Sequence, residues 1–137
     1  MSTATRTFTV EQANRMLPLV RRIVRDIVET HHKWSRSVQS YEAAATWTRA
    51  DSPSSQLAEL EAEVRALAVE IEGYLSELRE LGVDFKGFDQ GLVDFPCERD
   101  GRTACLCWKL DEPEVLYWHE TSDGFAGRQP LNEGTIP

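Results

Sequence analysis

Apolar residues recur along the first 81 positions at alternating steps of three and four, which is the spacing of one face of a helix. The first series comprises Leu17, Val20, Val24, Ile27, His31, Trp34, Val38, Tyr41 and Ala45, and the second comprises Leu57, Leu60, Val64, Leu67, Ile71, Tyr74, Leu78 and Leu81. The pattern predicts two long helices whose heptad faces can pack against each other as in a coiled coil.

Start and stop signals bound these helices. Thr9 and Gln12 have the spacing of a capping box at the start of the first helix, and Ser52-Pro53 has the form of a cap before the second. Gly82 follows the second helix as a C-terminal glycine does. Because the polar connection between the two series is short, the helices should form an antiparallel hairpin over residues 8–81, about 40 Å long.

The pattern changes after the second helix. Short apolar stretches at 92–98, 103–110 and 115–120 are typical of strands, and Asp100-Gly101 is a strong signal for a two-residue hairpin turn. The fold class is therefore α+β: a long antiparallel two-helix hairpin, coiled-coil-like, followed by a small three-stranded antiparallel β-meander.

We expect one domain over residues 1–137, since the chain has the length of a single domain. The helical hairpin would occupy 8–81, the small sheet and a structured tail 82–131, and a flexible end 132–137.

The turns set which residues of the sheet face each other. The turn at Asp100-Gly101 places Asp94 opposite Cys107, and a four-residue turn at 111–114 would place Cys107 opposite Trp118. One face then holds Asp94, Cys105, Cys107, Trp118 and Glu120, and the other holds Val93, Phe95, Leu106, Trp108, Tyr117 and His119. The second face is more apolar and should pack on the helices, but a slip of one residue in either hairpin would exchange the faces.

The net charge of the chain limits the classes of partner that it is expected to bind. It carries 15 Lys and Arg against 23 Asp and Glu, a net charge of −8, which is unfavourable for nucleic-acid binding. Residues 1–50 carry eight basic and four acidic side chains, whereas residues 51–81 carry two and eight, as paired helices of opposite charge would.

The expected cellular location follows from the hydropathy of the chain and from its cysteines. No stretch approaches the roughly 20 apolar residues of a membrane span, and no signal peptide opens the chain. The three cysteines are an odd number, which does not suit a disulfide framework. We expect a cytoplasmic protein with reduced thiols and without a membrane or nucleic-acid partner.

Cys107, His119 and Glu120 are candidate metal ligands, because thiolate, imidazole and carboxylate groups bind zinc or iron. No cofactor follows from the spacing, since the sequence has no Cys-x-x-Cys and His119 points away from Cys107 in the expected register. The same alternation opposes a cysteine nucleophile with His119 as its base. The alternative is that Cys105 and Cys107 are small buried apolar residues.

Two further polar residues have alternative roles. His31 lies in the first heptad series, where it could bind a ligand or, as we favour, form a hydrogen bond in the seam. Arg128 lies between small residues and suits a carboxylate or phosphate ligand. It could equally pair with Glu120 or Asp94 of its own sheet.

The C-terminal part of the chain contains Gly-Leu-Val-Asp-Phe-Pro, Leu-Cys-Trp, Tyr-Trp-His-Glu and Phe-Ala-Gly-Arg-Gln-Pro-Leu, and residues 8–24 read FTVEQANRMLPLVRRIV. In this combination the chain resembles a bacterial domain-of-unknown-function family, number twenty-two-oh-three. The resemblance implies no established activity. Its recurring motif residues are Asp94, Cys107, Trp118, His119, Glu120 and Arg128.

Two functions are compatible with these features. A hairpin and a small sheet make a thin core, so the first hypothesis is a non-enzymatic, homo-oligomeric interaction protein, a homodimer through the helices that could also bind another protein. The alternative is a small-molecule or metal-binding protein, or even an enzyme. Its site would contain Asp94, His119, Glu120 and Arg128, with Trp118 as a wall.

Overall fold

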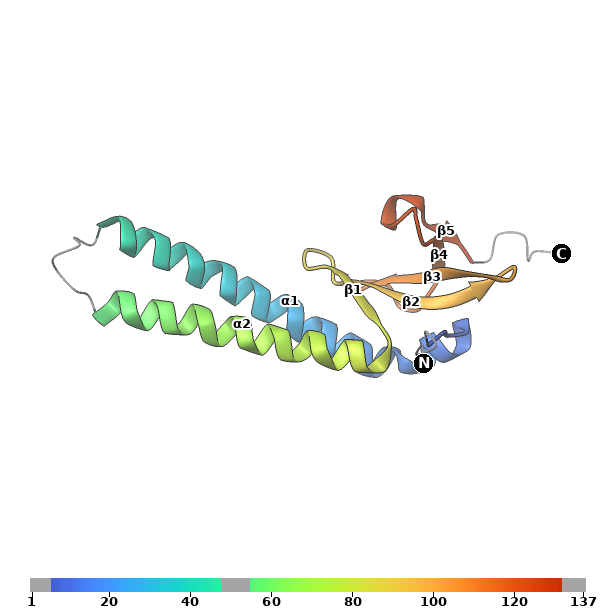
Figure 1. Ribbon diagram of the computed structural model, residues 1–137, viewed down its shortest axis with the longest axis horizontal. Coiled ribbons are helices and arrows are strands. Elements are labelled where there is room, and N and C mark those ends of the chain that lie inside the picture. The colour runs from blue at the N-terminus through green and yellow to red at the C-terminus, as the bar shows by residue number, and fades with distance from the viewer. Residues whose placement is uncertain (1–5, 48–54, 132–137) are drawn as a thin grey trace, which may run out of the picture.

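Two long helices lie side by side, and a small sheet packs near one end of the pair (Figure 1). The computed structural model describes residues 6–47 and 55–131. Helix α1 spans Val10–Trp47 and helix α2 spans Ser55–Leu81. They run in opposite directions (Figure 1), as the two heptad series predicted.

Two of the predicted end signals are confirmed. The backbone N–H of Gln12 donates to Thr9 Oγ1 at 3.0 Å, and the N–H of Thr9 donates to Gln12 Oε1 at 3.0 Å, which completes the capping box. After α2, Gly82 adopts a φ of 86° and Val83 N–H donates to the carbonyl of Leu78 at 3.0 Å. This pattern is a Schellman motif, which ends the helix and turns the chain toward the sheet.

Other expectations about the chain concern segments that the structure does not describe. The predicted cap at Ser52-Pro53 and the predicted flexible end at 132–137 lie outside the described residues. Within the described part of the chain, neither helix is long and apolar enough to cross a membrane.

The sheet has five antiparallel strands, and each strand pairs with the next along the chain. The strands are β1 (Asp84–Gly87), β2 (Leu92–Arg99), β3 (Arg102–Lys109), β4 (Tyr117–Glu120) and β5 (Gln129–Pro130). The expected three-stranded meander is therefore corrected to five strands. β1 and β5 are the edge strands, with four and two residues, and each takes its backbone hydrogen-bond partners from one neighbouring strand.

The β2–β3 hairpin follows the prediction. Asp94 lies opposite Cys107, and Arg99 lies opposite Arg102. Asp100 and Gly101 have φ values of 53° and 78°, which are typical of the type I′ turn that fits the twist of a hairpin.

The core lies where one face of the sheet packs near the first half of α1 (Figure 1). Its buried apolar members are Phe8, Ala13, Leu17, Val20, Ile23, Val24, Ile27, Leu78, Val83, Val93, Phe95, Cys97, Ala104, Leu106, Trp108, Val115 and Trp118. Within α1 the buried apolar residues end at Ile27, and α2 buries only Ile71 and Leu78. The hairpin therefore projects beyond the sheet as a pair of helices with little buried apolar surface.

The contact between the two helices is rotated relative to the predicted seam. Thr30 and Ser37 are buried in α1, whereas His31 and Val38 are only half-buried. Ser37 Oγ donates to Glu63 Oε2 of α2 at 2.8 Å, so this buried hydroxyl is satisfied. Apolar spacing alone gives no sign of such a contact, because the residues that make it are polar.

Candidate functional site

The pairing of β3 with β4 differs from the predicted register by one residue. Cys107 lies opposite Tyr117 and Cys105 lies opposite His119, instead of the residues one position later. Because side chains alternate along a strand, the shift moves every residue of β4 to the other face of the sheet. His119 thus joins Asp94 and the two cysteines on one face, which corrects the expectation that it points away from them.

Glu112 lies at the turn between β3 and β4 and is hydrogen-bonded to the end of β3. Its N–H donates to the carbonyl of Lys109 at 2.9 Å, and its Oε1 accepts the N–H of Lys109 at 3.0 Å. Its carbonyl also accepts the indole N–H of Trp108 at 2.9 Å. Beyond this turn, β4 enters the sheet displaced by one position from the predicted register.

The face away from the core carries a buried polar cluster formed by Asp94 of β2, Cys107 of β3 and His119 of β4. One donor atom from each side chain lies within 4.8 Å of the other two. Asp94 Oδ1 and His119 Nε2 are 3.0 Å apart. The three residues are 4%, 0% and 2% exposed, so the cluster is closed to solvent.

The hydrogen bonds of His119 indicate which ring nitrogen carries a hydrogen and which one faces Asp94. Nδ1 lies 2.7 Å from the carbonyl oxygen of Glu120, which can only accept, so Nδ1 carries a hydrogen and donates it. Nε2 is then the nitrogen that faces Asp94. In this pair one proton lies between a ring nitrogen and a carboxylate oxygen, the position that a metal ion occupies when both groups are ligands.

The thiols are protonated at neutral pH. Burial raises the pKa of Cys107 to about 11, although Arg128 opposes this effect. Burial, followed by the charge of Asp94, raises the pKa of Cys105 to about 12, and burial also raises the pKa of Cys97. Because a cysteine nucleophile reacts as the thiolate, these surroundings do not favour nucleophilic catalysis.

Two other candidate residues lie on the opposite face of the sheet. Arg102 donates to both carboxylate oxygens of Glu120, with Nε 3.0 Å from Oε1, and these hydrogen bonds lower the pKa of Glu120. Trp118 lies in the core, and the guanidinium of Arg99 covers its ring at 4.1 Å from the centroid. The structure thus brings Asp94 and His119 together and separates Glu120 and Trp118 from them.

Arg128 has a different acidic partner from the two that the sequence suggested. Its Nη1 and Nη2 donate to the two carboxylate oxygens of Glu112, each at 2.8 Å, and Nη2 also donates to the carbonyl of Cys107 at 3.2 Å. The guanidinium stacks on Tyr117 at 3.9 Å from the ring centroid. These contacts attach the tail to the β3–β4 loop and engage both Nη groups of Arg128.

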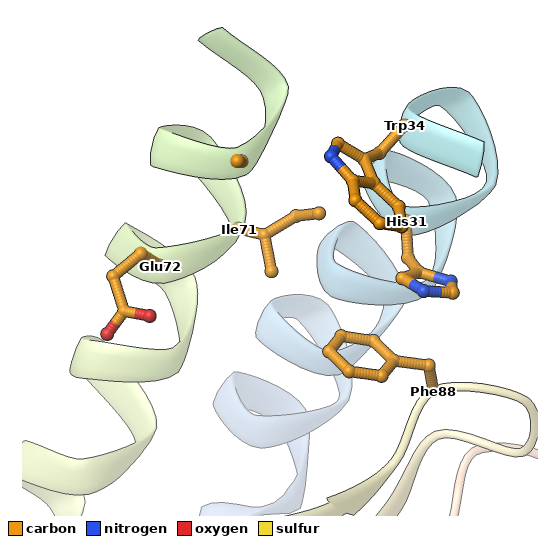
Figure 2. A pocket seen from close by; sticks show the side chains of 6 residues that line it. His31, Trp34, Ile71, Glu72 and Phe88 are labelled. Atoms are coloured by element: carbon orange, nitrogen blue, oxygen red, sulfur yellow. The ribbon is translucent and has the colours of Figure 1, made fainter. Parts of the chain in front are cut away.

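An apolar groove opens between the helices where they leave the sheet (Figure 2). It has a volume of about 240 Å³ and is lined by His31, Trp34, Ala68, Ile71, Glu72 and Phe88. His31 stacks on Phe88, with ring centroids 4.2 Å apart and planes at 15°. His31 therefore lies beside the helix–helix contact, in an aromatic stack, rather than inside the seam.

Further apolar residues lie on the same side of the hairpin, beyond the groove. Val38 and Tyr41 follow His31 and Trp34 by seven residues, about two helical turns, and so lie on the same side of α1. In α2, Val64 precedes Ile71 by the same spacing. Val38, Tyr41 and Val64 are each only half-buried. We refer to His31, Trp34, Val38, Tyr41, Val64 and Ile71 as the hairpin face.

The sequence alone did not identify Glu112, and it placed Asp94 and His119 in one candidate site without predicting that their side chains are in direct contact. Glu112 stands in an Asp-Glu-Pro-Glu stretch that is typical of a solvated turn. Only the fold shows that its carboxylate is enclosed by Arg128 and the end of β3. The contact between Asp94 and His119 depends on the register of β3 with β4, which the length of the turn between these strands did not determine.

The chain matches the model of DUF2203, described as an uncharacterized conserved protein, over residues 6–131, and it belongs to this family. The match covers both helices and all five strands. Searches of curated proteins and of solved structures found no match.

Proposed function

We propose that this protein is a non-enzymatic interaction protein that forms a homodimer through the hairpin face. The observation that carries the proposal is the half-burial of Trp34, Val38, Tyr41 and Val64, which belong to the apolar heptad series but lie beyond the sheet. Two helices can each cover only one side of the other, so a third and a fourth helix are needed to enclose such residues.

Charge supports a second copy of the chain as the occupant. Helix α1 carries six basic and four acidic residues, whereas α2 carries two basic and seven acidic residues. In a two-fold dimer, α1 of each protomer can lie against α2 of its partner, so the basic helix meets the acidic one on both sides. The result is an antiparallel four-helix, coiled-coil-like bundle.

The polarity of the two sides of the hairpin supports the choice of face. The side with the apolar groove is lined by aromatic and aliphatic residues, with Glu72 at its edge. The hollow between the helices on the other side has mainly polar lining residues: Lys33, Arg36, Ser37, Ser40, Glu63 and Leu67. An interface core is depleted in charged residues, so the first side is the better candidate.

The alternative function, a ligand site made of Asp94, His119, Glu120 and Arg128, has less support. Glu120 and Arg128 are each engaged in an ion pair with another residue. For the location we propose the cytoplasm, in keeping with three free cysteines, since reduced thiols are usual there. A further protein partner could bind the same hairpin face.

Sedimentation equilibrium of the full chain at micromolar concentration tests the dimer. We expect twice the chain mass for the wild type and the mass of a monomer for Val38→Glu, because the substitution places a charge in the apolar contact. Ala43→Glu is the matched control. Ala43 is exposed and lies about 140° around the helix from Val38, so this variant should remain dimeric.

A monomeric wild type would overturn the proposal. A Val38→Glu variant that dimerises as tightly as the wild type would place any interface elsewhere, and so would a dimer that Ala43→Glu disrupts equally. Circular dichroism of both variants checks that the helices are retained. Retention is expected because the buried core is formed by other residues.

A further inference from the structure

We propose that Asp94, Cys107 and His119 form a binding site for one divalent transition-metal ion, for which zinc fits the donor set best. The site lies in the sheet, and the inference does not depend on dimerisation through the helices. It rests on the position, donor chemistry and orientation of the three side chains.

The position of the cluster favours a defined site. The ligands come from β2, β3 and β4, the three central strands of the sheet, and Asp94 and Cys107 are direct cross-strand partners. Because strands hold their side chains more rigidly than loops do, such residues are suited to a fixed coordination geometry. Each of the three is also at least nine-tenths buried, so little movement is open to them.

The donor atoms match a divalent ion in type and charge. A thiolate, an imidazole nitrogen and a carboxylate oxygen are the three protein donors that zinc uses. As ligands, Cys107 and Asp94 each carry one negative charge and His119 is neutral, so the set balances the two positive charges of the ion. Binding therefore displaces the thiol proton of Cys107 and the proton between Asp94 and His119.

The spacing is close to what coordination requires. Zinc bonds of about 2.0–2.3 Å in a tetrahedron place donor atoms about 3.5 Å apart. Asp94 Oδ1 and His119 Nε2 are 3.0 Å apart, and the sulfur of Cys107 lies within 4.8 Å of both.

The orientation of His119 supports the site independently. A histidine that binds metal through one ring nitrogen usually donates the other N–H to a carboxylate or a backbone carbonyl. His119 does this with the carbonyl of Glu120 at 2.7 Å, which directs Nε2 toward the other two ligands. Cys105 lies on the same face opposite His119, but it is outside the group whose donor atoms all lie within 4.8 Å of one another.

The closed surroundings indicate a structural role for the ion. Since the cluster is buried, the ion would join three strands and would not meet a substrate. An ion that binds only the folded chain raises the free energy of unfolding, by about 2.7 kcal/mol at a hundredfold excess over the dissociation constant.

Titration of the full chain with Co²⁺ as a zinc substitute tests the site. We expect one equivalent to bind, with a thiolate-to-cobalt charge-transfer band in the near ultraviolet and visible bands typical of four-coordinate cobalt. One equivalent of Zn²⁺ should abolish these bands and raise the urea midpoint. The charge-transfer band should be lost in Cys107→Ser, and affinity should fall at least tenfold in His119→Ala and Asp94→Asn.

Two matched controls separate this site from other cysteine or carboxylate binding. Cys97→Ser removes a buried thiol on the opposite face and should bind like the wild type. Glu120→Gln should also bind like the wild type, because Glu120 is paired with Arg102. Cys105→Ser should keep the charge-transfer band, because Cys105 lies outside the group of three donor residues.

The titration of the wild-type chain tests the metal site even if one of the variants does not fold. A folded wild-type chain that shows no charge-transfer band with Co²⁺ and no change of urea midpoint with Zn²⁺ overturns the proposal. It is also overturned if Cys97→Ser loses the band as Cys107→Ser does.

Discussion

Arg128 and Glu112 form a bidentate ion pair between the tail and the β3–β4 loop, with both N–O distances at 2.8 Å and side chains only 13% and 11% exposed. Glu112 also accepts the N–H of Lys109. The pair thus holds the tail at the point where β3 ends.

Glu112→Gln is expected to lower the free energy of unfolding by about 2–4 kcal/mol, because it leaves the guanidinium of Arg128 largely buried without its countercharge. Urea denaturation followed by circular dichroism measures the change. Glu114→Gln is the matched control: Glu114 is exposed in the same loop and should alter stability by less than about 0.5 kcal/mol. Equal effects of the two substitutions would contradict the structural role of the pair.

Gly91→Ala should destabilise the protein more than Gly101→Ala. Both glycines have positive φ, 63° and 78°, so each alanine incurs backbone strain of about 1–2 kcal/mol. A Cβ at Gly91 would also lie 2.8 Å from Val24 and 2.9 Å from Leu110, whereas at Gly101 it would meet open space. Overpacking adds about 1–3 kcal/mol for Gly91→Ala alone. Thermal or urea unfolding of the two variants gives the comparison, and equal losses would show that the loop at Gly91 relaxes.

Stability should fall at alkaline pH. The folded chain raises the pKa of Cys105 to about 12 and of Cys107 to about 11, from an ordinary value near 9. The folded state therefore binds these protons more tightly than the unfolded state does. The resulting contribution to the free energy of unfolding is complete below about pH 9 and is lost as pH rises toward 11–12. Urea midpoints measured between pH 8 and 11 should decline, and less steeply in the Cys105→Ser/Cys107→Ser double variant. An equal decline in that variant would assign the effect to other groups.

Glu120→Gln should leave the urea midpoint at neutral pH nearly unchanged, because its ion pair with Arg102 is exposed at the tip of the hairpin. Hydrogen bonds from Arg102 lower the pKa of Glu120. The small stabilising contribution is thus present above the ordinary carboxyl pKa and is lost as pH falls through the lower, folded value. High salt should remove it. A loss of stability comparable with that of Glu112→Gln would contradict this assignment.

The neighbouring residues alone were sufficient to predict the helix ends and the turn whose sequence signals span only a few positions. The capping box at Thr9, the helix stop at Gly82 and the turn at Asp100-Gly101 all occur where the sequence predicted them. In each case the backbone conformation is determined by one or two side chains, or by a missing one, without help from distant parts of the chain.

Contacts between distant segments determined the rest. The short strands β1 and β5 each take their backbone partners from one neighbouring strand, and the helix contact uses Thr30 and Ser37 because the two helices approach there. The cluster of Asp94, Cys107 and His119 depends on a one-residue register. The sequence by itself determined which segments are helices and which are the main strands, since periodicity is local. Only the tertiary structure decided which face His119 occupies, because the pairing of β3 with β4 joins segments whose register the local sequence does not specify.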